Sequence, residues 1–133
     1  MEERRDPVRR IAGAIVALAC AATATACELP RGARLESERL ALAYWTIPAK
    51  IAVGQPFVVE IAACPKTSEP VSERVKFDAH MPEHRHGMNY RTKVVTMGGG
   101  RFHSEGWLFH MPGRWEFRFD IGNEHLVHSV LIE

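Results

Sequence analysis

Apolar and polar residues alternate with a period of two along most of the chain after residue 39. Between residues 114 and 121, aromatic or aliphatic side chains occupy every second position, and charged side chains occupy the positions between them. Because successive side chains of a strand point to opposite faces, this alternation predicts half-buried antiparallel strands. Seven strands are expected, at residues 40–47, 56–63, 73–81, 91–97, 101–110, 114–121 and 125–132.

Short turn signals rich in glycine and proline separate most of these strands, for example Gly98-Gly99-Gly100 and Pro112-Gly113. Seven short strands within about 100 residues predict an all-β fold, an immunoglobulin-like antiparallel β-sandwich. Aromatic residues at alternating positions are expected to fill the space between the two sheets. The residues predicted to be largely buried are Phe57, Ile61, Phe77, Trp115, Phe117 and Phe119.

The first 26 residues have the anatomy of an export signal. Four arginines lie within residues 4–10, residues 11–27 carry no charge, and Ala24-Thr25-Ala26 supplies a small-residue cleavage pattern. An uncleaved membrane anchor is the alternative, although a span needs roughly 20 apolar residues. We expect an export signal of plain or lipoprotein type at residues 1–26, a flexible tether at 27–38 and the sandwich domain at 39–133. The expected location is the bacterial cell envelope or periplasm.

The cysteines allow two arrangements. Cys27 directly follows the small-residue pattern, as does the lipidated cysteine of bacterial lipoproteins, and a lipid anchor at Cys27 would tether the domain to the membrane. Cys27 and Cys64 would instead form a disulfide in an oxidising compartment. The two arrangements exclude each other. If Cys27 is lipidated, Cys64 is left as a buried small residue, which we favour, or as a soft metal ligand.

Charge makes nucleic-acid binding an unfavourable hypothesis. Residues 1–26 contain four of the 17 Arg and Lys and three of the 16 Asp and Glu, so 13 of each sign remain in residues 27–133. No basic stripe interleaved with aromatic residues is present in the sequence.

Residues 81–88, Met81-Pro-Glu-His-Arg-His-Gly-Met88, combine two histidines and two methionines in one short stretch. Imidazole nitrogen and thioether sulfur together are a donor set that favours copper over magnesium, calcium or manganese. If this segment is extended, His84, His86 and Met88 point the same way and lie within reach of one ion. The alternative is a structural loop that binds no metal.

The tripeptide His-Met-Pro occurs twice, at residues 80–82 and 110–112, and each copy ends a predicted strand. If successive strands alternate in direction, both copies lie at the same end of the sandwich. Met81, His110 and Met111 would then complete a metal site with the residues of the first motif. A site with thioethers suits Cu(I), and one dominated by imidazoles suits Cu(II) or zinc. The residues not expected to be primary ligands are Met97, His103, His125 and His128.

The segments Met81-Pro-Glu-His-Arg-His-Gly-Met88 and Gly100-Arg-Phe…Gly106…Phe109-His-Met-Pro-Gly-Arg-Trp115 resemble the YtkA-like domain family. The resemblance extends over most of residues 55–132. It implies an exported immunoglobulin-like sandwich, often lipid- or membrane-tethered and sometimes linked to copper handling or respiratory-oxidase assembly. Cys64 and His110 depart from the general pattern. The matched residues are His84, His86, Met88, Met111, Gly113 and Trp115.

No catalytic motif accompanies the histidines, because Ser104 and Ser129 lack the Gly-x-Ser-x-Gly setting of a nucleophile elbow. We therefore expect a binding protein and not an enzyme. The leading hypothesis is an accessory protein that binds copper through the His/Met loop and exchanges it with an envelope or membrane protein. The alternative is a structural or interaction module of a membrane or respiratory-complex assembly that binds no metal.

Overall fold

A computed structural model of the chain describes residues 26–133, so residues 1–25 of the predicted export signal lie outside the described residues. These residues form nine strands and no helix. Within this part of the chain there is accordingly no helix long and apolar enough to cross a membrane. The strands are β1 (Ala33–Glu36), β2 (Leu40–Ile47), β3 (Pro56–Pro65), β4 (Val75–Met81), β5 (His86–Gly87), β6 (Lys93–Gly98), β7 (Arg101–Leu108), β8 (Gly113–Ile121) and β9 (Glu124–Ile132).

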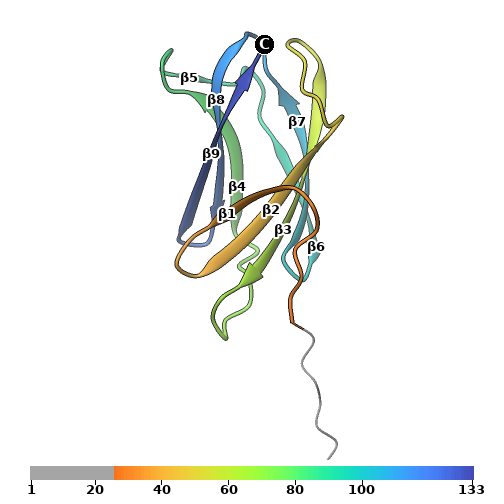
Figure 1. Cartoon of the computed structure of the whole chain (residues 1–133), viewed down its shortest axis with the longest axis vertical. Coiled ribbons are helices and arrows are strands. Elements are labelled where there is room, and N and C mark those ends of the chain that lie inside the picture. The colour runs from red at the N-terminus through yellow and green to blue at the C-terminus, as the bar shows by residue number, and fades with distance from the viewer. Residues whose placement is uncertain (1–25) are drawn as a thin grey trace, which may run out of the picture.

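Two antiparallel sheets form a sandwich (Figure 1). One sheet has the order β1-β2-β3-β7-β6 and the other has the order β5-β4-β8-β9. Strands β2, β3, β7 and β6 correspond to A, B, E and D of an immunoglobulin sandwich, and β4, β8 and β9 correspond to C, F and G. The predicted fold class is confirmed.

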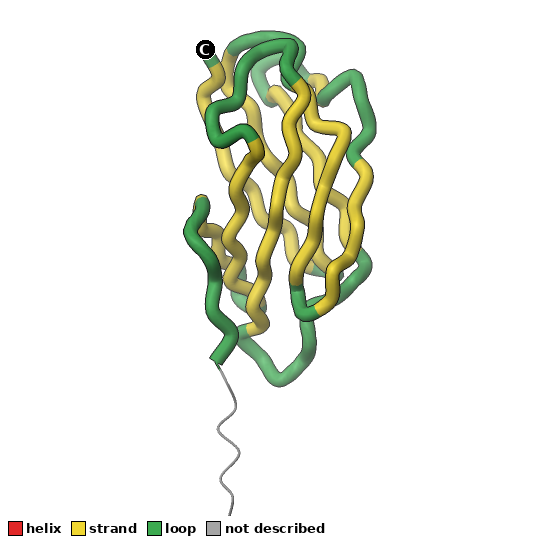
Figure 2. Tube along the Cα trace, turned by 90° about the vertical axis from the view of Figure 1, so that its right-hand side faces the viewer, coloured by secondary structure: helices red, strands yellow, loops and turns green. Residues whose placement is uncertain are grey.

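The connections gather at the two ends of the strands (Figure 2). One end carries the β4–β5 turn at residues 82–85 and the β7–β8 loop at residues 109–112, and we call it the histidine pole. The opposite pole carries the β3–β4 loop, the β6–β7 turn and the β8–β9 turn (Figure 1). The described chain also begins near the opposite pole. Strands β4 and β7 both end at the histidine pole, as their shared His-Met-Pro ending predicts.

All seven predicted strands are present, but two further strands were not predicted. The segment expected to be a flexible tether contains β1, which pairs with β2 from Ala33 opposite Tyr44 to Glu36 opposite Ala41. Its residues alternate, with Ala33 and Leu35 packed against the core and the two charged residues exposed. Only four residues lie between Pro30-Arg-Gly32 and Ser37, so their alternation is too short to be recognised in the sequence. The tether prediction is therefore wrong for residues 33–36.

The core consists mainly of aromatic rings from both sheets, and all six residues predicted to be buried are buried. Phe117 of β8 lies at its centre, with its ring centre 5.0 Å from that of Tyr44 and 5.4 Å from that of Trp107. The two ring pairs join opposite sheets, so they hold the two layers together. Such tilted arrangements are favourable for aromatic quadrupoles.

Two polar contacts are built into this apolar interior. The indole N–H of Trp107 donates to the hydroxyl of the fully buried Ser104 at 2.8 Å, so neither group lacks a partner. The Tyr44 hydroxyl and Nδ1 of His128 share a hydrogen bond of 2.6 Å that links β2 to β9. Burial raises the pKa of Tyr44, because the interior disfavours the phenolate. His128 therefore serves to join the sheets.

The disulfide between Cys27 and Cys64 ties the start of the described chain to β3, with 5.7 Å between the two Cα atoms. Of the two arrangements open from the sequence, the structure contains the disulfide. A cysteine in this bond has no thiol for lipid attachment, so lipidation of Cys27 is incompatible with this form of the protein. Cys64 is buried, as favoured, but it is a disulfide partner and not a free small residue.

Candidate metal centre

The β4–β5 turn places two histidines side by side. The amide of His84 donates to the carbonyl of Met81 at 3.2 Å and closes the turn, and Met81 then faces His86 across the short ladder. Arg85 has φ of 54°, a left-handed conformation that few non-glycine residues adopt. The rings of His84 and His86 lie with their centres 5.7 Å apart.

The expected reason for this proximity is wrong. An extended segment was predicted to align His84, His86 and Met88 through period-two alternation, but residues 82–85 form a turn. The left-handed Arg85 reverses the chain between the two histidines, and that reversal accounts for their adjacency. Because of this turn, period-two alternation no longer gives a reason for Met88 to point the same way as the two histidines.

The β7–β8 loop brings a third histidine to the same place. The His110 ring centre lies 5.2 Å from that of His86, so three imidazoles form a row in the order His84, His86, His110. We call this row the histidine cluster. The convergence predicted from the two His-Met-Pro tripeptides is thus present for His110.

Trp115 packs against two rings of the histidine cluster. Its indole is fully buried, and its ring centre lies 5.5 Å from that of His110 and 6.1 Å from that of His86. The indole stacks on Phe109 at 4.4 Å and donates to the Met111 carbonyl at 3.0 Å. Trp115 therefore connects the histidines to the rigid aromatic core.

Hydrogen bonding leaves nitrogen atoms of the cluster free. Nδ1 of His86 lies 3.0 Å from the Gly87 carbonyl, which can only accept, so Nδ1 donates this hydrogen bond and Nε2 is the nitrogen left for another partner. Nδ1 of His110 is buried and has no hydrogen-bond partner. A buried polar atom without a partner costs about 1–3 kcal/mol. The cluster therefore offers two nitrogens for a ligand: Nε2 of His86, whose ring is oriented by its hydrogen bond, and Nδ1 of His110, which lacks a partner.

The methionines of the predicted site are used for packing. Met81 belongs to the core with 1% of its surface exposed, and Met88 and Met111 are partly buried against that core. Met81 also reaches Gly113, where an added Cβ would lie 2.8 Å from its terminal methyl carbon. Gly113 has φ of 128°, so both its conformation and this close contact favour glycine.

Within residues 26–133, no three His, Cys, Asp or Glu side chains are already arranged as a complete set of metal ligands. His84 and His110 lie at the two ends of the row, so the side chains would have to move before all three could bind one ion. The neighbouring acid of the turn, Glu83, is engaged by Arg114 at 3.2 Å. The cluster is therefore a candidate centre made of imidazoles, without a free carboxylate from Glu83.

The remaining paired histidines lie elsewhere. His125 pairs with Asp120 at 2.7 Å next to the β8–β9 turn, and His103 on β7 lies between two carboxylates. Nδ1 of His103 bonds Glu60 and Nε2 bonds Glu105 at 3.1 Å. Since a carboxylate accepts at each nitrogen, these bonds favour the imidazolium and raise the pKa of His103.

This arrangement predicts a pH-dependent contribution to stability. A histidine whose pKa is raised by folding stabilises the protein below its unfolded pKa of 6.5, and that contribution is lost as the pH rises through the folded pKa. We expect the substitution His103→Gln to reduce this loss. Denaturant melts of both proteins between about pH 5.5 and about pH 9 bracket the usual histidine pKa and measure the effect. An unchanged slope of stability against pH would contradict the assignment.

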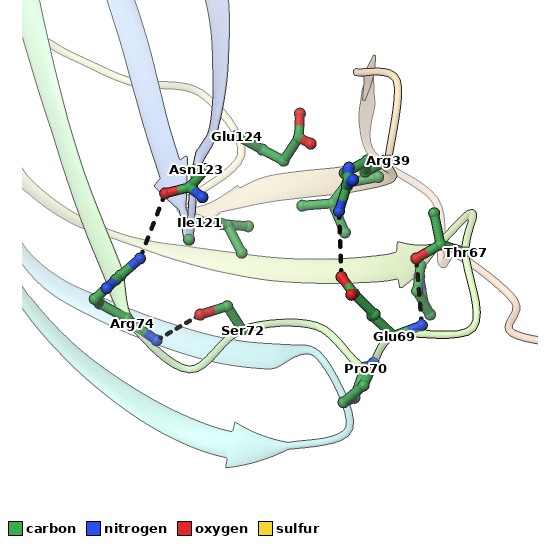
Figure 3. A pocket seen from close by; sticks show the side chains of 12 residues that line it. Arg39, Thr67, Glu69, Pro70, Ser72, Arg74, Ile121, Asn123 and Glu124 are labelled. Carbon is green, nitrogen blue, oxygen red and sulfur yellow. Dashed lines mark hydrogen bonds and ion pairs between the residues drawn. The ribbon is translucent and has the colours of Figure 1, made fainter.

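A hollow of about 490 Å³ lies at the opposite pole, between the β1–β2 turn, the β3–β4 loop and the β8–β9 turn (Figure 3). Its polar side chains bond one another: Arg39 pairs with Glu69 at 3.2 Å, and Arg74 donates to Asn123 at 3.5 Å. Arg39, Glu69, Arg74 and Asn123 therefore do not need a ligand to supply their hydrogen-bond partners.

No protein-family model, curated protein or solved structure matches the chain. The resemblance to the YtkA-like domain family therefore stays a prediction. The residues of the histidine pole are therefore the basis for a functional proposal.

Proposed function

We propose that this protein is an exported accessory protein that binds copper at the histidine pole and delivers it to a partner protein in the bacterial envelope. The observation that carries the proposal is the histidine cluster, in which three imidazoles lie in a row with ring centres 5.7 and 5.2 Å apart. Imidazole is a favoured ligand of copper, and divalent copper binds nitrogen sites more tightly than the other first-row divalent metals. The protein acts by binding and not by catalysis.

The position of the cluster supports delivery to a partner. Its residues come from a turn and a loop at one pole, while the described chain begins near the other pole (Figure 1). Any attachment through residues preceding 26 would leave the histidine pole facing away from that attachment. A partner could then approach the metal without passing the attached end.

The disulfide supports an extracytoplasmic location. Disulfides persist in the periplasm and outside the cell and are rare in the cytosol. Cys27–Cys64 therefore agrees with the export expected from the first 26 residues. In this proposal the domain is held in the envelope or released as a soluble protein.

A competition titration tests copper binding. The purified protein, titrated with Cu(I) and Cu(II) against chelators of known affinity, should bind one equivalent of copper with Kd below about 1 µM. The double substitution His84→Ala and His86→Ala should abolish this binding, because it removes two of three imidazoles. Far-UV circular dichroism should remain unchanged, since the turn lies outside the aromatic core.

His103→Ala is the matched control, because it removes an imidazole that is bonded to Glu60 and Glu105 on the face of another sheet. It should leave the copper affinity unchanged. A double mutant that binds copper like wild type would refute the site. A double mutant that unfolds would show that the histidines hold the turn together.

The second candidate is an interaction module that binds no metal. Tyr90 is 57% exposed and lines a mostly apolar hollow of about 310 Å³ with Pro56 and Leu108, beside the loop that follows β5. A protein segment with an apolar side chain would fit this hollow. Absence of copper binding in the titration, with the fold intact, would favour this candidate.

A further inference from the structure

We infer that two copies of this chain pair through β9, edge to edge and antiparallel, so that the β5-β4-β8-β9 sheet of one copy continues into the same sheet of the other. The partner is a second copy of this chain, related by a two-fold axis that passes through the strand. This inference does not depend on copper binding, because it concerns a sheet edge that the histidine cluster does not use. In such a dimer the two histidine poles point in opposite directions.

Strand β9 is a long, regular edge. It lies at the end of its sheet, and β8 is its only hydrogen-bonded neighbour. Its nine residues pair with β8 without a bulge, from Glu124 opposite Ile121 to Ile132 opposite Gly113. The strand contains no proline, glycine or lysine, the residues that commonly protect or interrupt an edge. Within the part of the chain that the structure describes, no other backbone bonds to it outside this ladder. An edge of this kind can pair with another strand.

The other sheet edges in residues 26–133 are short or protected. Strand β1 has four residues and β5 has two. The part of β4 beyond β5 is capped by side chains, because the Ala79 amide donates to the Asp78 carboxylate at 2.8 Å and the Thr92 hydroxyl donates to a β4 carbonyl. Strand β6 has a bulge between Thr96 and Gly98, which disrupts its pairing edge. The contrast singles out β9 as the edge suited to pairing.

The outer face of β9 carries two exposed apolar side chains, Val127 with 50% of its surface exposed and Leu131 with 71%. They lie four positions apart and therefore on the same face of the strand. If Ser129 lies opposite Ser129 of the second copy, Val127 faces Leu131 of the second copy. The two-fold axis repeats this contact, so each exposed apolar residue gains an apolar cross-strand partner.

The charged ends of the strand fit the same register. With the axis at Ser129, His125 lies opposite Glu133 of the second copy, so an imidazole faces a carboxylate. Moving the axis one residue towards the start of the strand would place Leu131 opposite His125. Moving it one residue towards the end would place Val127 opposite Glu133. The register centred on Ser129 is therefore the one that matches apolar with apolar and basic with acidic residues.

Sedimentation equilibrium of the purified protein, from micromolar to near-millimolar concentration, tests the dimer. The mass should rise with concentration to twice that of the single chain. Val127→Lys should raise the dissociation constant by roughly tenfold or more, because the axis places the new charge twice in the interface and lysine blocks edge pairing. Val95→Lys is the matched control, because Val95 is 53% exposed on the edge strand β6. It should leave the dissociation constant unchanged.

Charge substitutions at residue 129 test the register. Ser129→Lys and Ser129→Glu should each weaken the dimer, because like charges then lie directly opposite each other at the axis. An equimolar mixture of the two variants should associate more tightly than either variant alone, because the mixed dimer places opposite charges there. Only a register that sets residue 129 against itself produces this recovery.

Hydrogen exchange on the wild type needs no substitution and decides the question if a variant fails to fold, as judged by circular dichroism. Amides of β9 should gain protection as the concentration rises through the dissociation constant. A wild type that stays monomeric over the whole range would overturn the inference and leave β9 for a strand of a different protein. A dimer that persists in Val127→Lys, dissociates in Val95→Lys or gives no added protection in β9 would also overturn it. Absence of recovery in the mixture would overturn the register centred on Ser129.

Discussion

Replacing Phe117 by Ala is expected to lower the free energy of unfolding by about 3–5 kcal/mol, the usual cost of removing a large core aromatic. The ring is fully buried in the middle of β8, where it contacts Tyr44 and Trp107 of the opposite sheet and Phe119 of its own sheet. No neighbouring side chain can fill the space without loss of its own packing, because cores are close-packed. Denaturant melts of the two proteins measure the difference.

Arg118→Ala is the matched control on the same strand. Its side chain is 46% exposed and points away from the core, so the expected change is within about 0.5 kcal/mol. If Phe117→Ala costs no more than Arg118→Ala, then the inward face of β8 is assigned incorrectly. The alternation of burial along the strand would then be wrong as well.

Removing the disulfide by Cys27→Ser and Cys64→Ser should destabilise the protein by about 2–5 kcal/mol. The bond closes a segment with a sequence separation of 37, for which the chain-entropy account gives roughly 4 kcal/mol. The disulfide also fixes the residues that lead into β1, so β1 should become the first strand to lose protection in hydrogen exchange. Melts of the double mutant and of the wild type measure the change.

The wild type in excess reductant provides the control, because it should unfold at the same denaturant concentration as the double mutant. Equal stability of wild type with and without reductant would contradict the role of the bond. Alkylation of Cys27 and Cys64 in protein that has never been reduced would show that the disulfide does not form.

The fold could be predicted because the period-two pattern is strong where both sheets bury one face. In β8 the inward positions are aromatic or aliphatic and the outward positions are charged, so strand, face and burial follow from the residues alone. The meeting of His86 and His110 could also be predicted in part, because strand direction fixes which ends share a pole. The positions of the histidines within that pole could not be predicted from the period-two alternation.

The details of the site depend on features without a periodic signature. The left-handed conformation of Arg85 turns the chain between the two histidines, and a non-glycine residue gives no sequence signal for it. The methionines match a copper-binding composition, but Met81 continues the inward face of β4 after Phe77 and Ala79 and is buried for that reason. The sequence also allowed both fates of Cys27, because small residues before a cysteine suit either one.

The most direct test of the account is a crystal of the copper-loaded protein measured at the copper absorption edge. We expect one anomalous peak at the histidine pole, about 2.0 Å from ring nitrogens of the histidine cluster. An anomalous map with no peak at that pole, or with the peak beside other residues, would contradict the claim that this pole binds copper.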